Sequence, residues 1–268
     1  MKVLMIDVGG TSVKLMASGH EGFRRFPSGR GLTAAKMVEG VLAETKDWEY
    51  EAVSLGFPGL VRDGKIARDP LNLGGGWMKY DFEKGFGRPV RIINDAAMQA
   101  LANYDSGRLL FLGLGTSVGA ALIADDAVIP LEIGIIPLSK SEVFMDRLSK
   151  KALDSHGRRR WQKAVNRAVF LLRDIFWPDH FQLGGGNTKH LDPIPEGCTA
   201  GNNQDAFRGA VRLWPGADML AISQTTTLRI VRNAEAEAGE QAGAGQISGM
   251  VPGGLLGPPG TARVWDGD

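Results

Sequence analysis

Apolar runs of strand length alternate with glycine-rich turns through the first half of the chain. Continuous or alternating apolar runs predict strands, whereas apolar positions that recur every three to four residues predict a helix. The strands expected on this basis cover residues 3–9, 12–18, 23–27, 51–61 and 88–95. Helices are expected over 32–47 and 96–104, and 62–77 is rich in turn residues and is expected to be a loop.

The second half begins with the same kind of pattern. Residues 108–129 (RLLFLGLGTSVGAALIADDAVI) predict a second hairpin. Residues 156–180 predict an amphipathic helix that Pro178 ends, because proline cannot continue a helix. A short strand is then expected within 180–187, where it runs into three glycines.

The two hairpins share a sequence at their turns. Gly-Thr-Ser-Val at residues 10–13 recurs at residues 115–118, each time between two strand-like apolar runs. An identity at the same place in the same predicted hairpin, once per half of the chain, indicates a duplicated unit. We therefore expect one Gly-Thr turn from each half.

Composition narrows the classes of protein without selecting one. The 268 residues are enough for two domains or one large one, and 43% hydrophobic residues is ordinary for a globular protein. A net charge of +1 gives no indication of a nucleic-acid or membrane partner. The single cysteine, Cys198, excludes a disulfide framework, and Asp7 interrupts the first apolar segment before it could be a signal peptide. These features predict a cytoplasmic protein.

The stretch IDVGGTSVK at residues 6–14 has two interpretations. Gly9-Gly10 between apolar runs is typical of a plain β-hairpin. The same glycines could also expose backbone N–H groups to a phosphate, with Thr11 adding a hydroxyl and Lys14 a charge. An isolated glycine-rich motif does not decide between them.

Four features in order favour the phosphate interpretation: DVGGTSVK, IINDAA, LGLGTSVG and LGGGN. Two Gly-Thr turns, an aspartate at a strand-to-helix junction and a later glycine loop are what a phosphotransferase cleft needs. In such a cleft the aspartate accepts a hydroxyl proton, and most of the rest is positioning and charge stabilisation. Asp7 could hold Mg²⁺ through water, because Mg²⁺ keeps much of its hydration shell.

With these motifs the chain resembles the ROK family (repressors, open reading frames, kinases), and within it the polyphosphate glucokinase-like branch. The resemblance covers roughly residues 1–214 and implies an α/β actin/hexokinase-like (ribonuclease H-like) ATPase fold with two lobes around a cleft. It is carried by the segments Asp7–Lys14, Gly56–Gly59, Asn94–Ala96, Leu114–Thr116, Glu132–Gly134, Arg158–Trp161 and Leu183–Asn187.

The resemblance implies a sugar kinase that uses Mg²⁺ and transfers a phosphoryl group from ATP or polyphosphate to a hexose hydroxyl. Asp95 would be the general base, Asn94 and Glu132 would bind the sugar, and Asp7 would hold the metal. The phosphate-binding residues would be Gly9, Gly10, Thr11, Lys14, Gly115, Thr116, Gly184, Gly185 and Gly186. A plain helix N-cap remains the alternative for Asp95, and an ordinary strand-to-helix turn for the three glycines.

Two departures from the family pattern qualify this expectation. Members usually carry Glu-x-Gly-His, whereas this chain has Ile135 in place of the histidine that binds sugar. Met145 also stands where the related polyphosphate enzymes tend to have a glutamate. A sugar hydroxyl facing an apolar wall loses a partner, so an alternative function is a sugar- or phosphate-binding protein with little turnover. A DNA-binding regulator is not expected, since the first residues already form the predicted phosphate-binding strand and leave no room for a helix-turn-helix before it.

The expected lobes are residues 1–95 and 96–202, with a late helix over about 203–214 that packs back on the first lobe. Residues 215–268 are a low-complexity tail, expected to be poorly ordered apart from a weak strand candidate at 221–231. Arg158-Arg159-Arg160 is either a solvated basic patch or a landing site for polyphosphate. The resemblance also allows a homodimer.

Overall fold

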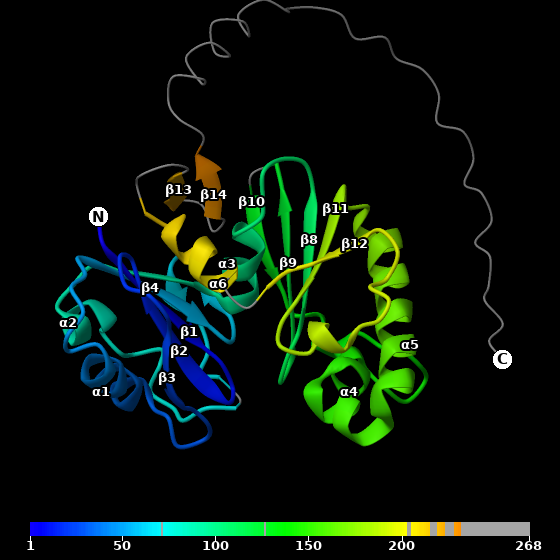
Figure 1. The fold of residues 1–268 in the computed structure, drawn as a ribbon, viewed down its shortest axis with the longest axis horizontal. Coiled ribbons are helices and arrows are strands. Elements are labelled where there is room, and N and C mark those ends of the chain that lie inside the picture. The colour runs from blue at the N-terminus through cyan, green and yellow to red at the C-terminus, as the bar shows by residue number, and fades with distance from the viewer. Residues whose placement is uncertain (71, 126, 203–204, 215–218, 223–227, 232–268) are drawn as a thin grey trace, which may run out of the picture. The chain divides into compact units, whose positions relative to one another are not determined.

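A computed structural model of the chain describes residues 1–70, 72–125, 127–202, 205–214, 219–222 and 228–231. All of these belong to one unit, Met1–Arg232. Its described part contains two main β-sheets, with helices on their faces (Figure 1). No helix in this described part is both long and apolar enough to span a membrane.

The first sheet comes from the first 94 residues and has the strand order β3-β2-β1-β4-β7. Its strands are β1 (Val3–Val8), β2 (Ser12–Ala17), β3 (Arg24–Pro27), β4 (Ala52–Phe57) and β7 (Val90–Asn94). β1 pairs antiparallel with β2 and parallel with β4, and every residue of β1 and β4 is buried. Such continuous apolar runs are typical of central strands covered on both faces.

The second sheet has the order β12-β11-β8-β9-β10-β14-β13. Its strands are β8 (Leu109–Leu114), β9 (Val118–Ala124), β10 (Ala127–Leu131), β11 (His180–Gly184), β12 (Cys198–Ala200), β13 (Met219–Ile222) and β14 (Leu228–Val231). β8 pairs antiparallel with β9 and parallel with β11. The hairpin predicted over 108–129 is therefore confirmed.

The strand orders confirm the duplication that the repeated turn predicts. In the first sheet the order β3-β2-β1-β4-β7 places an antiparallel meander beside two parallel strands. The order β10-β9-β8-β11-β12 in the second sheet has the same senses of pairing. Both Gly-Thr turns thus join the first two strands of equivalent sheets.

Two helices lie between the sheets (Figure 1). α3 (Asp95–Leu101) and α6 (Asp205–Val211) share a core with Met5 of the first sheet and Phe111 of the second. α1 (Ala34–Glu44) and α2 (Phe82–Phe86) pack with the core on the other face of the first sheet. The alternation of β1 explains this layering, because Leu4, Ile6 and Val8 point to one face and Met5 to the other.

The long helix α5 (Lys150–Phe176) covers the other face of the second sheet. The apolar face predicted for this helix is confirmed, since Trp161, Val165 and Leu172 are fully buried. It begins six residues before the predicted start and is kinked at Gly157, whose φ is +76°. Two residues before Pro178 it ends, as expected.

Short elements in the loops escaped the sequence pattern. They are β5 (Val61–Arg62), β6 (Lys65–Ile66), α4 (Phe144–Leu148) and the 3-10 turns Ile133–Ile135 and Thr188–His190. β5 and β6 form a small hairpin over residues 61–66, and all of it except Val61 lies where only a loop was expected. Their few residues carry no periodicity, so only packing selects their conformation.

The segment after Trp214 contains more structure than its composition predicts. β13 and β14 pair with each other, and β14 pairs with β10 at the edge of the second sheet. β14 lies inside the strand candidate at 221–231 and β13 overlaps its first two residues, so the structure has two short strands where one weak strand was expected. The remainder of 215–268 lies outside the described residues.

Candidate active site

The two Gly-Thr turns meet at one place in the molecule. The hydroxyl oxygens of Thr11 and Thr116 are 3.2 Å apart, although 105 residues separate them in sequence. Each turn is held at the end of its hairpin, by register pairs Val8–Val13 and Leu114–Val118. The turns of two duplicated sheets therefore face each other across a single site.

Asp7 and Lys14 lie beside the first turn. They are opposite each other in the β1–β2 register, and the Lys14 Nζ donates to Asp7 Oδ2 at 3.0 Å. Asp7 is 6% exposed, so its carboxylate is held inside the site and carries a counter-charge there. The lysine remains about half exposed and can reach an anion in the cleft.

The glycine loop after β11 packs onto the second turn. The backbone N–H of Asn187 donates to the carbonyl of Leu114 at 2.9 Å, and its side-chain Nδ2 donates to the carbonyl of Gly115 at 3.1 Å. Gly185 has φ +83°, and a Cβ there would press against the Leu114 backbone. Only glycine suits this position. Asn187, which closes the LGGGN motif and was assigned no role from the sequence, fixes the loop to the turn through these two hydrogen bonds.

Asn94, and not Asp95, is the N-cap of α3. The side-chain Oδ1 of Asn94 accepts from the backbone N–H groups of Ala96 and Ala97 at 3.0 and 3.1 Å, and its Nδ2 donates to the carbonyl of Gly59. The alternative that Asp95 is merely the cap is therefore wrong. Because Asn94 takes the cap role, the Asp95 carboxylate, which accepts from the backbone N–H of Ala96, remains available to the cleft.

The environment of Asp95 raises the pKa of its carboxyl from 3.8 to about 7. Burial is the largest cause, and the negative charges of Asp7 and Glu132 act in the same direction. The hydrogen bond from Ala96 N–H opposes them. A carboxyl that titrates near neutral pH is suited to accept a proton and release it again.

Two cavities share Asp95 as a wall. The larger, about 390 Å³, is lined by Asp7, Lys14, the two Gly-Thr turns and the glycine loop. The smaller, about 140 Å³, is lined by Asn94, Glu132 and the loop that contains Asn72. Gly10, Pro58, Asp95, Thr116, Ser117 and Gly119 line both. A group in one cavity can thus meet a group in the other only beside Asp95 and the turns.

Each cavity also holds polar residues that the motifs did not indicate. Lys150, Lys189 and His190 line the larger cavity, on α5 and the turn after the glycine loop. Arg68 and Asn72 line the smaller one. These residues stand in segments without a motif of their own, so only the tertiary structure brings them to the site.

Asp69 shapes the loop around the smaller cavity. Its carboxylate accepts from the backbone N–H groups of Gly76, Trp77 and Met78 at 2.8 to 3.1 Å. These bonds lower the pKa of Asp69 below its usual value, because they favour the charged form. Although Asp69 lines the cavity, its carboxylate oxygens accept hydrogen bonds from the loop backbone and so hold the loop in shape.

Ile135 and Met145, which stand where related proteins have polar residues, lie in different environments. Ile135 does not form the apolar wall that was expected: its side chain is 79% exposed at the end of the 3-10 turn and lines neither cavity. Met145 does line the smaller cavity. Met145 there joins other apolar residues that line the same cavity, among them Leu60, Leu73 and Leu131.

The residues that line the larger cavity fit a Mg²⁺ ion that is also bound by substrate phosphates. Among the described residues no group of three or more His, Cys, Asp or Glu side chains is arranged to hold an ion. One buried carboxylate, Asp7, faces the larger cavity. Mg²⁺ bound to substrate phosphates needs only one or two carboxylates and keeps its waters.

Comparison with known proteins agrees with this geometry. No family model matches the chain. A polyphosphate glucokinase from Mycobacterium tuberculosis is 28% identical over 150 residues, which cover 51% of this chain and 56% of that protein. The match thus spans about half the length of this curated relative.

Solved structures match more of the fold. The inorganic polyphosphate/ATP-glucomannokinase from Arthrobacter sp. strain KM has a TM-score of 0.69 and 23% identity, over 78% of this chain and 96% of that one. A ROK family glucokinase from Streptomyces griseus, solved with glucose and AMPPNP, has a TM-score of 0.67 and 18% identity, over 80% and 99%. The chain therefore has the two-sheet α/β fold of ROK, hexokinase-like sugar kinases, and polyphosphate glucokinases are among its homologues.

Proposed function

We propose that this protein is a sugar kinase that transfers a phosphoryl group from ATP or polyphosphate to a hexose hydroxyl. The observation that carries the proposal is the position of Asp95 in the wall shared by two cavities, beside the meeting turns of Thr11 and Thr116. The smaller cavity would hold the sugar, and the larger one would hold the phosphates of the donor.

In the proposed reaction Asp95 accepts the proton of the sugar hydroxyl as that oxygen forms its bond to phosphorus. The bond between this phosphorus and the bridging oxygen of the donor breaks, and the remaining phosphates take the negative charge. Lys14 and the backbone N–H groups of the two turns stabilise charge on the phosphates. Mg²⁺, held through water by Asp7, would supply further positive charge to the phosphate oxygens.

The decisive experiment is a coupled assay of the purified protein over a panel of hexoses and amino sugars, each with Mg-ATP and with polyphosphate. Glucose is the first acceptor to try. Sugar phosphate that forms with the wild type but not with Asp95→Asn supports the proposal. An absence of product from every acceptor and donor pair would remove it.

A second candidate is a sugar- or phosphate-binding protein with little turnover. Met145 favours it, because an apolar side chain lines the cavity that would have to bind a polyhydroxy compound. A ligand that binds only the folded state raises the apparent melting temperature. Stabilisation by glucose or by AMPPNP without product formation would select this candidate over the kinase.

The pKa of Asp95 predicts the pH dependence of turnover. The proton acceptor must be charged, so kcat/KM for the sugar is expected to rise about tenfold per pH unit below pH 7 and to level off above it. Because Glu132 helps to raise the pKa of Asp95, Glu132→Gln should move the midpoint to lower pH. Initial rates between pH 5 and 9, with saturating donor, measure both. A profile that is flat from pH 5 to 8 would contradict the role of Asp95.

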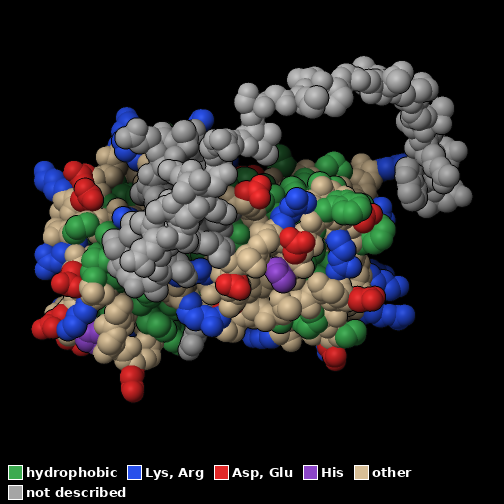
Figure 2. Space-filling view, turned by 90° about the horizontal axis from the view of Figure 1, so that it is seen from above, with side chains coloured by type: hydrophobic (Ala, Val, Ile, Leu, Met, Phe, Trp, Pro, Cys, Tyr) green, Lys and Arg blue, Asp and Glu red, His purple; other side chains and the backbone are tan. Residues whose placement is uncertain are grey.

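The basic run on α5 bears on the choice of donor. Arg158 Nε donates to the carbonyl of His190 at 2.8 Å, and His190 lines the larger cavity, so the run lies next to the proposed phosphate site. Arg159 and Arg160 are exposed. In Figure 2, Lys and Arg side chains lie along both the left-hand and the right-hand edges, and Figure 1 shows α5 on the right-hand side. A long polyanion could extend from the cavity onto these cations, whereas ATP is too short to need them.

Replacing Arg158, Arg159 and Arg160 together by Gln is therefore expected to raise KM for polyphosphate about tenfold, the effect of roughly 1.4 kcal/mol spread over three exposed charges. KM for Mg-ATP should change less than about threefold. The matched control is K36Q/K46Q/K84Q, which removes three exposed cations at or beside α1 and α2. If the KM values for polyphosphate and for Mg-ATP changed equally, the three arginines would be a solvated basic patch with no role in donor binding.

A further inference from the structure

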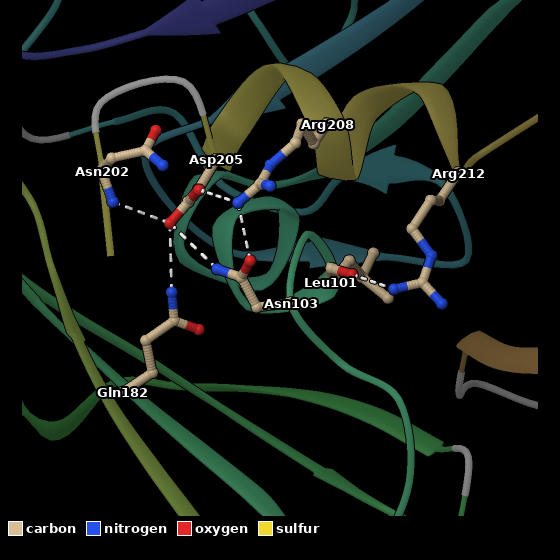
Figure 3. A network of polar contacts seen from close by, with 7 residues as sticks. All are labelled: Leu101, Asn103, Gln182, Asn202, Asp205, Arg208 and Arg212. Atoms are coloured by element: carbon tan, nitrogen blue, oxygen red, sulfur yellow. Dashed lines mark hydrogen bonds and ion pairs between the residues drawn. The ribbon is translucent and has the colours of Figure 1, made fainter. Parts of the chain in front are cut away.

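A buried carboxylate lies at the start of α6, outside both cavities. Asp205 is 1% exposed, and its Oδ2 accepts from the side chains of Asn103 at 3.0 Å and Gln182 at 3.1 Å and from the backbone N–H of Asn202 at 2.9 Å. Its Oδ1 accepts from Arg208 at 2.6 Å (Figure 3). A charge this well buried and this fully bonded holds its neighbours in one arrangement.

The partners of Asp205 stand on the segments that lead to the site. Gln182 lies in β11, two residues before Gly184, which is roughly 7 Å along a strand. Asn103 lies two residues after α3, whose first residue is Asp95, and eight residues of helical rise correspond to roughly 12 Å. Asp205 therefore joins the strand that ends in the glycine loop to the helix that begins with the proposed base.

Only a carboxylate suits this position. All four partners are donors, and a carboxylate is the side chain that accepts at both oxygens. An asparagine would turn its NH₂ toward one of those donors. Gln182 depends on the contact in particular, since within the described ranges its buried Oε1 has no hydrogen-bond partner. Its amide is held by Asp205 through Nε2.

α6 is fastened to the first sheet as well. The Ser54 hydroxyl, on β4, donates to the carbonyl of Ala210 at 2.8 Å and accepts from Trp214 Nε1 at 2.8 Å. Ser54 is fully buried. With Asp205 bonded to β11 at one end and Ser54 bonded near the other, this short helix connects both sheets on which the site is built.

We propose that Asp205 is a positioning residue for phosphoryl transfer, which fixes α3 and the glycine loop relative to each other through Asn103 and Gln182. The inference rests on the proposed kinase function, because the groups that it aligns are the base and the phosphate loop. It touches neither sugar nor donor. Its loss should therefore lower the rate at which bound substrates react more than it weakens their binding.

The test compares D205N with the wild type in two measurements, both made at a temperature at which thermal melting shows each protein to be folded. With glucose and the donor that the wild type uses, kcat is expected to fall 10- to 100-fold while both KM values stay within about threefold, since small misplacements of reacting groups cost rates of this size. Hydrogen exchange of the free proteins should be faster over residues 96–103 and 184–188. D47N is the matched control, because it removes another Arg-paired carboxylate, 2.7 Å from Arg24, on the far side of the first sheet.

The outcomes separate the two proposals. Unchanged hydrogen exchange in both segments, or a loss of activity that D47N reproduces, would overturn the positioning role. A wild type without turnover would remove the kinase proposal, while the exchange measurement would still decide whether Asp205 couples the two segments. Should D205N fail to fold, R208Q keeps the carboxylate and removes its cation. It is expected to act in the same direction with a smaller, three- to tenfold loss in kcat.

Discussion

Asp95→Asn is expected to lower kcat for sugar phosphorylation by about 10² to 10⁴-fold, the usual contribution of a positioned proton acceptor. The substitution keeps the shape of the side chain, and its remaining oxygen can still accept from Ala96 N–H. What it removes is the group whose pKa is poised at about 7 in the wall between the two cavities. Single-turnover rates with saturating sugar and donor measure the effect.

A stability measurement distinguishes this loss from misfolding. The folded state raises the pKa of Asp95, so it binds more protons than the unfolded state between about pH 4 and pH 7, and stability falls as the pH rises through this window. Above pH 7 the charged Asp95 costs the fold up to about 4 kcal/mol. D95N should therefore melt at a higher temperature than the wild type at pH 8, and at a similar temperature at pH 4. An inactive variant that is less stable at pH 8 would contradict this account.

The hairpins and their duplication could be predicted because their signals are local. A strand pattern, a Gly-Thr turn and a second strand occur twice, and the two sheets repeat one strand order. The buried face of α5 was readable for the same reason, as Trp161, Val165 and Leu172 recur with helical spacing. That the turns of Thr11 and Thr116 face each other depends on packing between the sheets, and it was suggested by the order of the four motifs and by the family resemblance.

Other features of the site depend on backbone geometry and tertiary contacts, which the amino-acid sequence alone does not specify. Either Asn94 or Asp95 suits an N-cap, and the choice follows from where the helical dihedral angles begin. Ile135 was expected to line the sugar site, yet the 3-10 turn directs it outward, and Met145 lines the cavity instead. The cluster around Asp205 joins residues up to 105 positions apart, so no sequence window contains it.

Gly209→Ala is expected to be among the most destabilising single-methyl changes in the described part of the chain. A Cβ at Gly209 would overlap the carbonyl oxygen of Met98, because α6 and α3 touch backbone to backbone there. Alanine gains about 1 kcal/mol in helix propensity over glycine. The overlap is with main chain that cannot rotate aside, so overpacking of about 3 kcal/mol or more outweighs this gain. The melting temperature should fall by roughly 4 to 8 °C.

Gly31→Ala is the matched control, because a Cβ at Gly31 would meet nothing within 4 Å, and its melting temperature should stay close to that of the wild type. The substitution at Gly209 should also reduce turnover at temperatures where the variant is folded, since the helix that it displaces begins with Asp95. A G209A protein as stable as G31A would mean that α3 and α6 separate at no cost. The two helices would then be a loose contact between the sheets, and the rigid connection on which the alignment of base and phosphate loop depends would have to be sought elsewhere.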